Sequence, residues 1–194
     1  MLSRRLFVAS FLAGSAANGV CLLGANAAHA EAVLGDDGLY RQPWFLESFL
    51  ELADDLAGAG DKKKRFAIMW ELRGCPYCKQ THLVNFAKPE ISNFIKDRFE
   101  ILQLNIVGSR EVTDFDGEKL SEKRFAEKYG VRYTPTFQFF SDNVSDLARK
   151  KPREREVARA QGYLEPRQFL AMFRFVSERA YEKGSLQDYL KANG

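Results

Sequence analysis

The sequence predicts an α/β fold, and three observations lead to this prediction. Its 194 residues are 45% hydrophobic and 28% charged, which suits one globular domain with a sizeable core and excludes a disordered chain. Between residues 66 and 106, a strand pattern, a helix pattern and a second strand pattern follow one another. Such a connection is normally right-handed and makes the two strands parallel. Two cysteines stand where the first strand meets the helix, which makes this junction the candidate functional site.

Residues 1–30 have the composition of an export signal. Arg4 and Arg5 are the only charged residues, and an apolar, alanine-rich run follows them. The segment ends in Ala28-His29-Ala30, a small-x-small pattern that a signal peptidase cuts. We therefore expect cleavage after Ala30 and a periplasmic location. Loss of the two arginines removes most of the formal charge of +3, so no basic excess indicates a nucleic-acid ligand.

The sequence leaves the export route open. Ser3-Arg4-Arg5-Leu6-Phe7-Val8 resembles the twin-arginine motif, which implies export after folding. Ordinary secretory signals also carry paired arginines. An uncleaved membrane anchor is a further alternative, but glycine and polar residues between positions 14 and 19 interrupt the apolar run. We expect no stable membrane insertion after cleavage.

The first predicted element of the mature chain is an amphipathic helix over residues 43–57. Apolar residues recur there at three- and four-residue intervals with acids between them, and Pro43 suits the first helical turn. Glycines end the pattern before a basic run that we interpret as a solvated loop. We assign residues 31–62 to an N-terminal helical extension that precedes the main domain.

The main domain, residues 63–194, begins with a mostly apolar strand over 66–72. A helix is expected over 78–87, and Pro89 should interrupt it before a second helical piece. Alternation over residues 99–106 predicts the next strand. The remaining predicted elements are a polar loop at 108–120, a helix at 121–129, a strand at 136–140, a charged and turn-prone stretch at 142–156, a strand at 157–163, a helix at 166–182 and a final helix capped by Ser185.

The pair Cys75 and Cys78 suits thiol–disulfide exchange. Cys75 begins a helix, where free backbone N–H groups and the helix dipole favour a thiolate, and Arg73 could add to this effect. Cys78 lies about one turn later and can attack a mixed disulfide formed on Cys75. Pro76 fits the first helical turn because it needs no N–H partner there. We therefore assign attack to Cys75 and resolution to Cys78.

Other uses of the cysteine pair remain open. A structural disulfide would close a very short loop and constrain little of the unfolded chain. A metal site needs more ligands than Cys75, Cys78 and His82 supply, so we expect no metal cofactor, and we interpret His82 as an ordinary helix-surface residue. A dithiol module that binds copper is the alternative from another class, although the mature chain has few methionines and one histidine.

Over residues 66–163 the chain resembles the thioredoxin superfamily. The residues that carry the resemblance are the Cys-Pro-Tyr-Cys unit between a strand and a helix, and Thr134-Pro135 at the start of a later strand. The resemblance implies a thioredoxin fold over 63–194, with a central mixed sheet flanked by helices. It also implies that Pro135 is cis and lies beside the dithiol, and that Pro76, Tyr77 and Thr134 help to bind the substrate. No cofactor beyond the redox-active Cys75–Cys78 disulfide is implied.

The chain departs from cytosolic thioredoxins at the position of their buried acid, which accepts the proton of the resolving thiol. Met69 occupies that position here, and Glu71 follows two residues later on the same face of the strand. Glu71 either replaces the acid as proton acceptor or is a solvated residue at the sheet edge. Gly74 stands where those proteins have a tryptophan.

A narrower resemblance is to SoxW-type periplasmic thioredoxins of bacterial sulfur-oxidation clusters, carried by residues 73–79, 105–117 and 133–136. It implies a reductase that takes electrons from a membrane thiol transporter and reduces protein disulfides, among them those of sulfur-oxidation carrier proteins. Oxidase or isomerase activity stays open because reduction potentials in relatives span about −270 to −120 mV. We expect a monomer. Two further interpretations are a turn at 114–117 rather than a calcium loop, and a solvated hairpin tip at 149–155.

Overall fold

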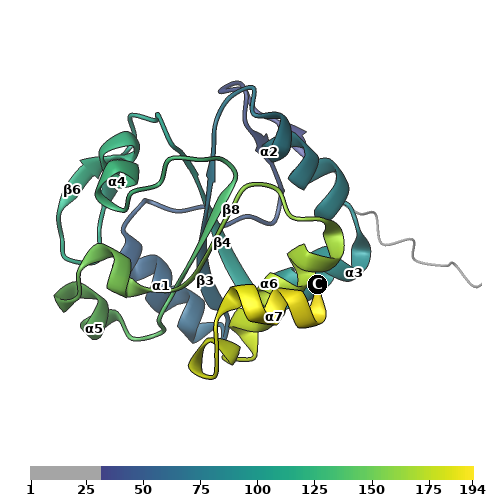
Figure 1. Cartoon of the computed structure of the whole chain (residues 1–194). Helices are drawn as coiled ribbons and strands as arrows, with labels where there is room; N and C mark the ends of the chain where they lie inside the picture. The colour runs from purple at the N-terminus through teal and green to yellow at the C-terminus, as the bar shows by residue number, and fades with distance from the viewer. Residues whose placement is uncertain (1–31) are drawn as a thin grey trace, which may run out of the picture.

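The computed structural model describes residues 32–194 (Figure 1). The predicted signal and its cleavage position therefore lie outside the described residues. A four-stranded mixed sheet forms the centre, with strand order β4-β3-β7-β8. Strand β3 pairs in parallel with β4 and antiparallel with β7, and β7 pairs antiparallel with β8. The strands are β3 (Arg65–Glu71), β4 (Phe99–Asn105), β7 (Thr136–Phe140) and β8 (Glu156–Gln161). The predicted mixed sheet flanked by helices is confirmed.

Helices cover both faces of this sheet because alternate side chains of the central strands are apolar on both sides. On one face Phe66, Ile68 and Trp70 of β3 pack in a core with residues of α1 (Leu52–Asp61) and α4 (Glu122–Lys128). On the other face Ala67 and Met69 pack in a second core with residues of α3 (Pro89–Arg98) and α6 (Pro166–Ser177). Figure 1 shows α6 and α3 on one side of β3 and β4, and α1 on the other.

Aromatic side chains dominate the second core. Phe173 of α6 lies edge-on to three phenylalanines that reach it from the sheet, with ring centroids 4.9 to 5.7 Å apart. This geometry is the favoured one for aromatic pairs. The three sheet residues are Phe99, Phe137 and Phe139.

The remaining elements lie around the sheet. They are the hairpin β1 (Val33–Leu34) and β2 (Tyr40–Arg41), helix α2 (Pro76–Gln80), the π-helical turn η1 (Thr81–Asn85), the hairpin β5 (Glu111–Thr113) and β6 (Lys119–Ser121), helix α5 (Val144–Arg149), the 3₁₀ turns η2 (Pro152–Arg155) and η3 (Ala180–Glu182), and helix α7 (Leu186–Asn193). Across residues 32–194, none of the helices has the length and hydrophobicity needed to cross a membrane.

The predicted helix over 43–57 is wrong in its bounds, because α1 begins only at Leu52. Leu50 has a φ of 65°, a left-handed conformation that a helix interior does not admit. Upstream, the backbone N–H of Leu46 donates to the carbonyl oxygen of Ile101 on β4 at 2.9 Å. This contact with the sheet, which the periodic pattern does not reveal, holds the segment in a non-helical path.

Two segments predicted to be irregular contain regular structure, and one helix is shorter than predicted. The loop expected at 108–120 contains most of the β5–β6 hairpin, and the turn-prone stretch at 142–156 contains α5 and η2. The helix expected over 166–182 ends at Ser177, and Arg179 has a φ of 55° before η3. The turn at 114–117 is confirmed by a 2.8 Å hydrogen bond from the Gly117 N–H to the Asp114 carbonyl oxygen.

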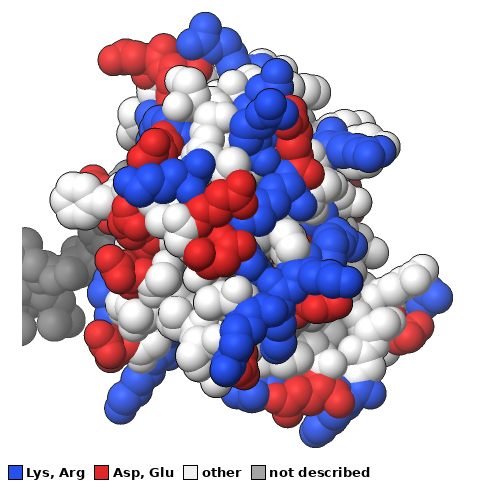
Figure 2. Space-filling model, turned by 90° about the vertical axis from the view of Figure 1, so that its left-hand side faces the viewer, with Lys and Arg blue, Asp and Glu red and all other residues white. Residues whose placement is uncertain are grey.

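The expected solvated tip at 149–155 is wrong for Arg155, whose side chain is only 2% exposed. Its guanidinium donates to Asp114, to the hydroxyl of Tyr129 and to Asp116, each at 2.8 Å. These partners come from the β5–β6 turn and the end of α4, so Arg155 links three segments. Figure 2 shows the face that carries α4, β6 and α5, where basic and acidic side chains are interspersed.

Candidate functional site

Cys75 and Cys78 form a disulfide at the N-terminus of α2, with their Cα atoms 5.3 Å apart. Strand β3 ends at Glu71, and a turn that includes Gly74, with a φ of 75°, leads into the helix. Cys75 caps the helix: its Sγ accepts a hydrogen bond from the backbone N–H of Cys78 at 3.1 Å. Cys75 is partly exposed, whereas Cys78 is 4% exposed. One sulfur is thus open to a partner and the other is covered.

The Thr134–Pro135 peptide bond is cis and lies beside this disulfide. The carbonyl oxygen of Thr134 is 3.5 Å from Cys75 Sγ. The next carbonyl, that of Pro135, accepts the N–H of Gly162 at 2.8 Å and fixes the loop to the end of β8. The structure therefore brings the two distant sequence motifs together at one sulfur atom.

Tyr77 stands on the solvent side of the disulfide and is 55% exposed. Its ring stacks on that of Tyr163, with centroids 6.2 Å apart. The Tyr163 hydroxyl donates to Asn85 Oδ1 at 3.2 Å, which ties this pair to the turn that follows α2. Desolvation and the nearby Glu165 raise the pKa of Tyr163, so it remains a neutral phenol at physiological pH.

Glu71 is fully buried, so its interpretation as a solvated edge residue is wrong. It ends β3 directly before the turn to the cysteines, where it is covered by neighbouring segments. One carboxylate oxygen lies 2.7 Å from Nε2 of His82, and the other accepts a hydrogen bond from the Gln103 side chain on β4. The carboxylate is therefore held from two sides.

His82 is only 1% exposed, and its interpretation as a helix-surface residue is wrong. Its Nδ1 lies 3.2 Å from the amide nitrogen of Gln42, which is also 3.5 Å from the His82 carbonyl oxygen. An amide nitrogen only donates, so Nδ1 accepts and Nε2 carries the proton that His82 donates to Glu71. The sequence does contain a signal for the burial of His82: it follows the buried Cys78 by four residues, which places both on one helix face.

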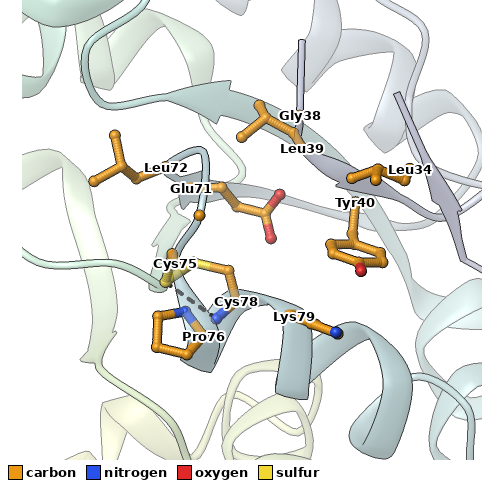
Figure 3. A pocket seen from close by; sticks show the side chains of 11 residues that line it. Leu34, Gly38, Leu39, Tyr40, Glu71, Leu72, Cys75, Pro76, Cys78 and Lys79 are labelled. Atoms are coloured by element: carbon orange, nitrogen blue, oxygen red, sulfur yellow. Dashed lines mark hydrogen bonds between the residues drawn. A yellow bond between two sulfur atoms is a disulfide. The ribbon is translucent and has the colours of Figure 1, made fainter. Parts of the chain in front are cut away.

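A pocket of about 370 Å³ opens beside the disulfide (Figure 3). Three segments form its walls: the β1–β2 hairpin, the end of β3 with the turn after it, and the start of α2. In Figure 3 the Glu71 side chain points into the space between the cysteines and Tyr40. The lining residues are Leu34, Gly38, Leu39, Tyr40, Glu71, Leu72, Gly74, Cys75, Pro76, Cys78 and Lys79.

A mixed sheet that carries a Cys-x-x-Cys disulfide at a helix N-terminus, next to a cis-proline, is consistent with the class of thiol–disulfide oxidoreductases. Comparison with known protein families identifies the family of this chain. Residues 52–177 match the model of the thioredoxin-like domain, and the chain belongs to this family. The matched part begins at α1 and ends with α6, so the β1–β2 hairpin lies outside it.

One solved structure agrees with this fold. A thioredoxin-fold protein from Helicobacter pylori has 22% sequence identity and a TM-score of 0.52, over 68% of this chain and 84% of its own. A thioredoxin from Thermus thermophilus has 21% identity and a TM-score of 0.46, over 69% of this chain and 86% of its own. No curated protein matches the chain.

Proposed function

We propose that this protein is an exported thiol–disulfide oxidoreductase that works as a reductase in the periplasm. The observation that carries the proposal is the disulfide itself: Cys75 is partly exposed beside the cis-proline loop, and Cys78 is covered. A nucleophile needs access to its substrate, whereas a resolving thiol needs access only to the first sulfur. The two cysteines thus have the environments that their predicted roles require.

The reaction begins with the reduced protein. The Cys75 thiolate is stabilised by the helix N-terminus and the Cys78 N–H, and it attacks one sulfur of a substrate disulfide. A bond forms from Cys75 to that sulfur, and the other substrate sulfur leaves as a thiolate. Cys78 then attacks Cys75 and releases the second substrate thiol. Two electrons pass to the substrate, and the protein is left with the Cys75–Cys78 disulfide.

The attack by Cys78 requires loss of its proton, and we assign Glu71 as the acceptor. Both residues line the same pocket, which gives water a place to bridge them. Each carboxylate oxygen can accept two hydrogen bonds, so the contacts with His82 and Gln103 leave acceptor capacity for a group in the pocket. His82 and Gln103 touch no substrate in this scheme and act as positioning residues.

The substrate chain is expected to bind along the cis-proline loop. Thr134 lies next to Cys75 through its backbone, so a chain bonded to that sulfur passes close to the Thr134 peptide groups. Pro76 and Tyr77 are exposed, Thr134 is half-buried, and Pro135 is buried next to Thr134. We assign these four residues to the proposed substrate-binding site.

The resemblance to SoxW-type proteins suggests the partners. A membrane thiol transporter would reduce the Cys75–Cys78 disulfide, and the reduced protein would act on disulfides of periplasmic proteins such as sulfur-oxidation carriers. We expect a monomer with no cofactor besides the disulfide. The alternative from another class, a copper-binding dithiol, is disfavoured because the imidazole of His82 is already engaged by Glu71 and Gln42.

Trapping tests the function. Cys78→Ala should accumulate mixed disulfides between Cys75 and exported proteins, and the double variant Cys75→Ala/Cys78→Ala should accumulate none. Absence of any trapped partner, together with tight binding of one copper ion per monomer and no reduction of insulin disulfides, would favour the copper module.

The equilibrium reduction potential against glutathione tests the direction. A value near −270 mV supports the reductase, and a value above about −150 mV supports an oxidase.

A further inference from the structure

The pocket beside the disulfide has a wall that lies outside the family-matched part of the chain. The β1–β2 hairpin is held by contacts with the turn after β3 and with β4. The Arg73 side chain donates to the Asp37 carbonyl oxygen at 2.7 Å, and the Gln103 side chain donates to that of Tyr40 at 2.6 Å. Gly38 allows this approach, because a Cβ there would lie 2.8 Å from the Arg73 side chain. The hairpin is therefore held in position as one wall of the pocket.

The interior of this pocket is mainly apolar. Leu34, Leu39, Leu72 and the ring of Tyr40 line it together with Pro76 and the cysteines. Such a lining favours an apolar occupant, because an apolar group that leaves water for it gains free energy in proportion to the area buried.

Two charged residues border the same pocket. The first is Glu71, whose two oxygens are engaged by His82 and Gln103. The second is Lys79, whose Nζ lies 6.0 Å from the centre of the Tyr40 ring. Lys79 is exposed, so its charge is available to a ligand at the mouth of the pocket. The pocket therefore has a mainly apolar interior that also contains the buried Glu71 carboxylate, and a cationic rim at Lys79.

The position of the pocket beside the disulfide indicates that its occupant is part of the substrate chain. Cys75 and Cys78 both form part of the pocket wall, so a chain that is bonded to Cys75 passes its entrance. One residue of extended chain spans about 3.5 Å, so the residue adjacent to the substrate cysteine is the one that can reach the interior. A volume of about 370 Å³ lies at the small end of the range for ligand pockets and has room for a large side chain.

We propose that this pocket binds a large apolar side chain adjacent to the reactive cysteine of the disulfide substrate, with an acidic residue beyond it facing Lys79. This inference rests on the proposed oxidoreductase function and names the substrate class that the site selects. Leu34 is 56% exposed at the pocket wall, so the occupant would cover part of its apolar surface.

Synthetic peptides test the proposal. Each peptide carries one cysteine bonded to a chromogenic thiol, flanked by Leu-Asp in one set and by Ser-Asp in the other, with the flank placed before or after the cysteine. When reduced protein attacks, the peptide sulfur bonds to Cys75 and the chromogenic thiolate leaves with the electron pair. The second-order rate constant follows from the absorbance of the released thiolate. We expect the leucine peptide, in one of the two orders, to react about tenfold faster than its serine counterpart.

Two neighbouring residues provide a matched pair of variants. Val33 and Leu34 are adjacent in β1 and are 59% and 56% exposed, but only Leu34 lines the pocket. Leu34→Ser should bring the ratio of the leucine to the serine rate close to one, and Val33→Ser should keep that ratio. The ratio within each variant cancels any general change in reactivity. Replacing the acidic residue of the leucine peptide by lysine should slow it several-fold, and Lys79→Gln should reduce that difference.

Different results would overturn the pocket assignment and the oxidoreductase function. Equal rates for the leucine and serine peptides in the unmodified protein would overturn the pocket assignment, as would an equal effect of Leu34→Ser and Val33→Ser on the ratio. If neither peptide reacts at all, the oxidoreductase function itself fails.

Discussion

At the residue scale, the cysteine pair can be identified from the sequence alone, whereas the burial of Glu71 cannot. The spacing of the two cysteines and their place at the start of a helix are typical of thiol–disulfide exchange. Alternation along β3 placed Glu71 on the same face as Met69, but its burial depends on β4 and on His82, neither of which is local in sequence. His82 does carry a local signal, because it follows the buried Cys78 by four residues, but its contact with Glu71 depends on the fold.

Glu71→Gln should separate the two chemical steps. The variant keeps the size of the side chain but removes the carboxylate that is proposed to accept the Cys78 proton. Loss of a proton acceptor slows a step by about a hundredfold or more in typical enzymes, and we expect at least a tenfold slower decay of the mixed disulfide. The initial attack by Cys75 should change little. Rapid-quench analysis of the mixed disulfide measures both rates.

Glu100→Gln is the matched control. Glu100 lies on β4, is 8% exposed and pairs with Lys64 at 2.9 Å, away from the pocket. The same substitution there should leave both steps unaltered. If Glu71→Gln slowed attack and resolution equally, the role of Glu71 would be structural rather than that of a proton acceptor.

At the element scale, the four strands of the central sheet agree closely with the prediction, whereas the charged segments do not. The bounds of β7 match the prediction at both ends, and those of β3 differ from it by one residue, because apolar runs and alternation are local signals. The density of charged residues at 149–155 predicts a solvated hairpin tip. Instead, η2 is anchored by Arg155, whose acidic partners lie about forty residues earlier in the chain.

Arg155→Ala should therefore destabilise the protein strongly. Removing one partner of a buried ion pair typically costs about 3 to 5 kcal/mol, because the other charge stays buried. Lys128 also pairs with Asp114, at 2.5 Å, so we expect a loss near the lower end, about 3 kcal/mol. Arg153→Ala, in the same turn but exposed, should change the free energy of unfolding by less than about 0.5 kcal/mol. Urea unfolding at pH 7 measures both variants, and similar losses in the two would contradict the assignment.

The same contact gives a dependence on pH. Burial acts to raise the pKa of Asp116, but hydrogen bonds from Arg155 and Lys128 outweigh it and hold that pKa well below its usual range. A depressed pKa in the folded state stabilises the protein above the unfolded value, about 4, and this contribution is lost as the pH falls below it. Asp116→Asn should therefore flatten the acid limb of the stability profile between about pH 5 and 2. An unchanged acid limb would exclude this source of stability.

At the scale of the whole molecule, the β1–β2 hairpin near the N-terminus contributes to the pocket at the disulfide. The β1–β2 hairpin precedes the family-matched residues 52–177, yet it forms a wall of the pocket at the disulfide. Local patterns indicated only an extension there, because the hairpin is held by Gln103 and Arg73, which lie far along the chain. The position of the mature N-terminus therefore determines whether the pocket wall is complete, in addition to reporting on export.

Cleavage after Ala30 would leave Glu31 as the first residue and keep β1 intact, whereas a cut beyond Leu34 would remove part of the pocket wall. We expect the periplasmic fraction of a bacterial host that expresses the full chain to contain a product that begins at Glu31, as read by intact mass. Ala30→Phe should block this cut because signal peptidase requires a small residue there, and Ala27→Phe, outside the small-x-small pattern, should not.

Replacing Arg4 and Arg5 together by lysine distinguishes the two export routes. Both substitutions keep the positive charge that a general secretory signal needs, so export by that route should continue unchanged. The twin-arginine route reads the arginines themselves, so export by that route should stop and the precursor should remain in the cytoplasm. The difference has a chemical consequence at Cys75 and Cys78: a protein exported folded arrives with its pocket assembled, whereas one exported unfolded must build the pocket before the cysteines can exchange electrons selectively. Full processing to Glu31 of the lysine variant would establish the general route, and accumulation of the precursor would establish the twin-arginine route.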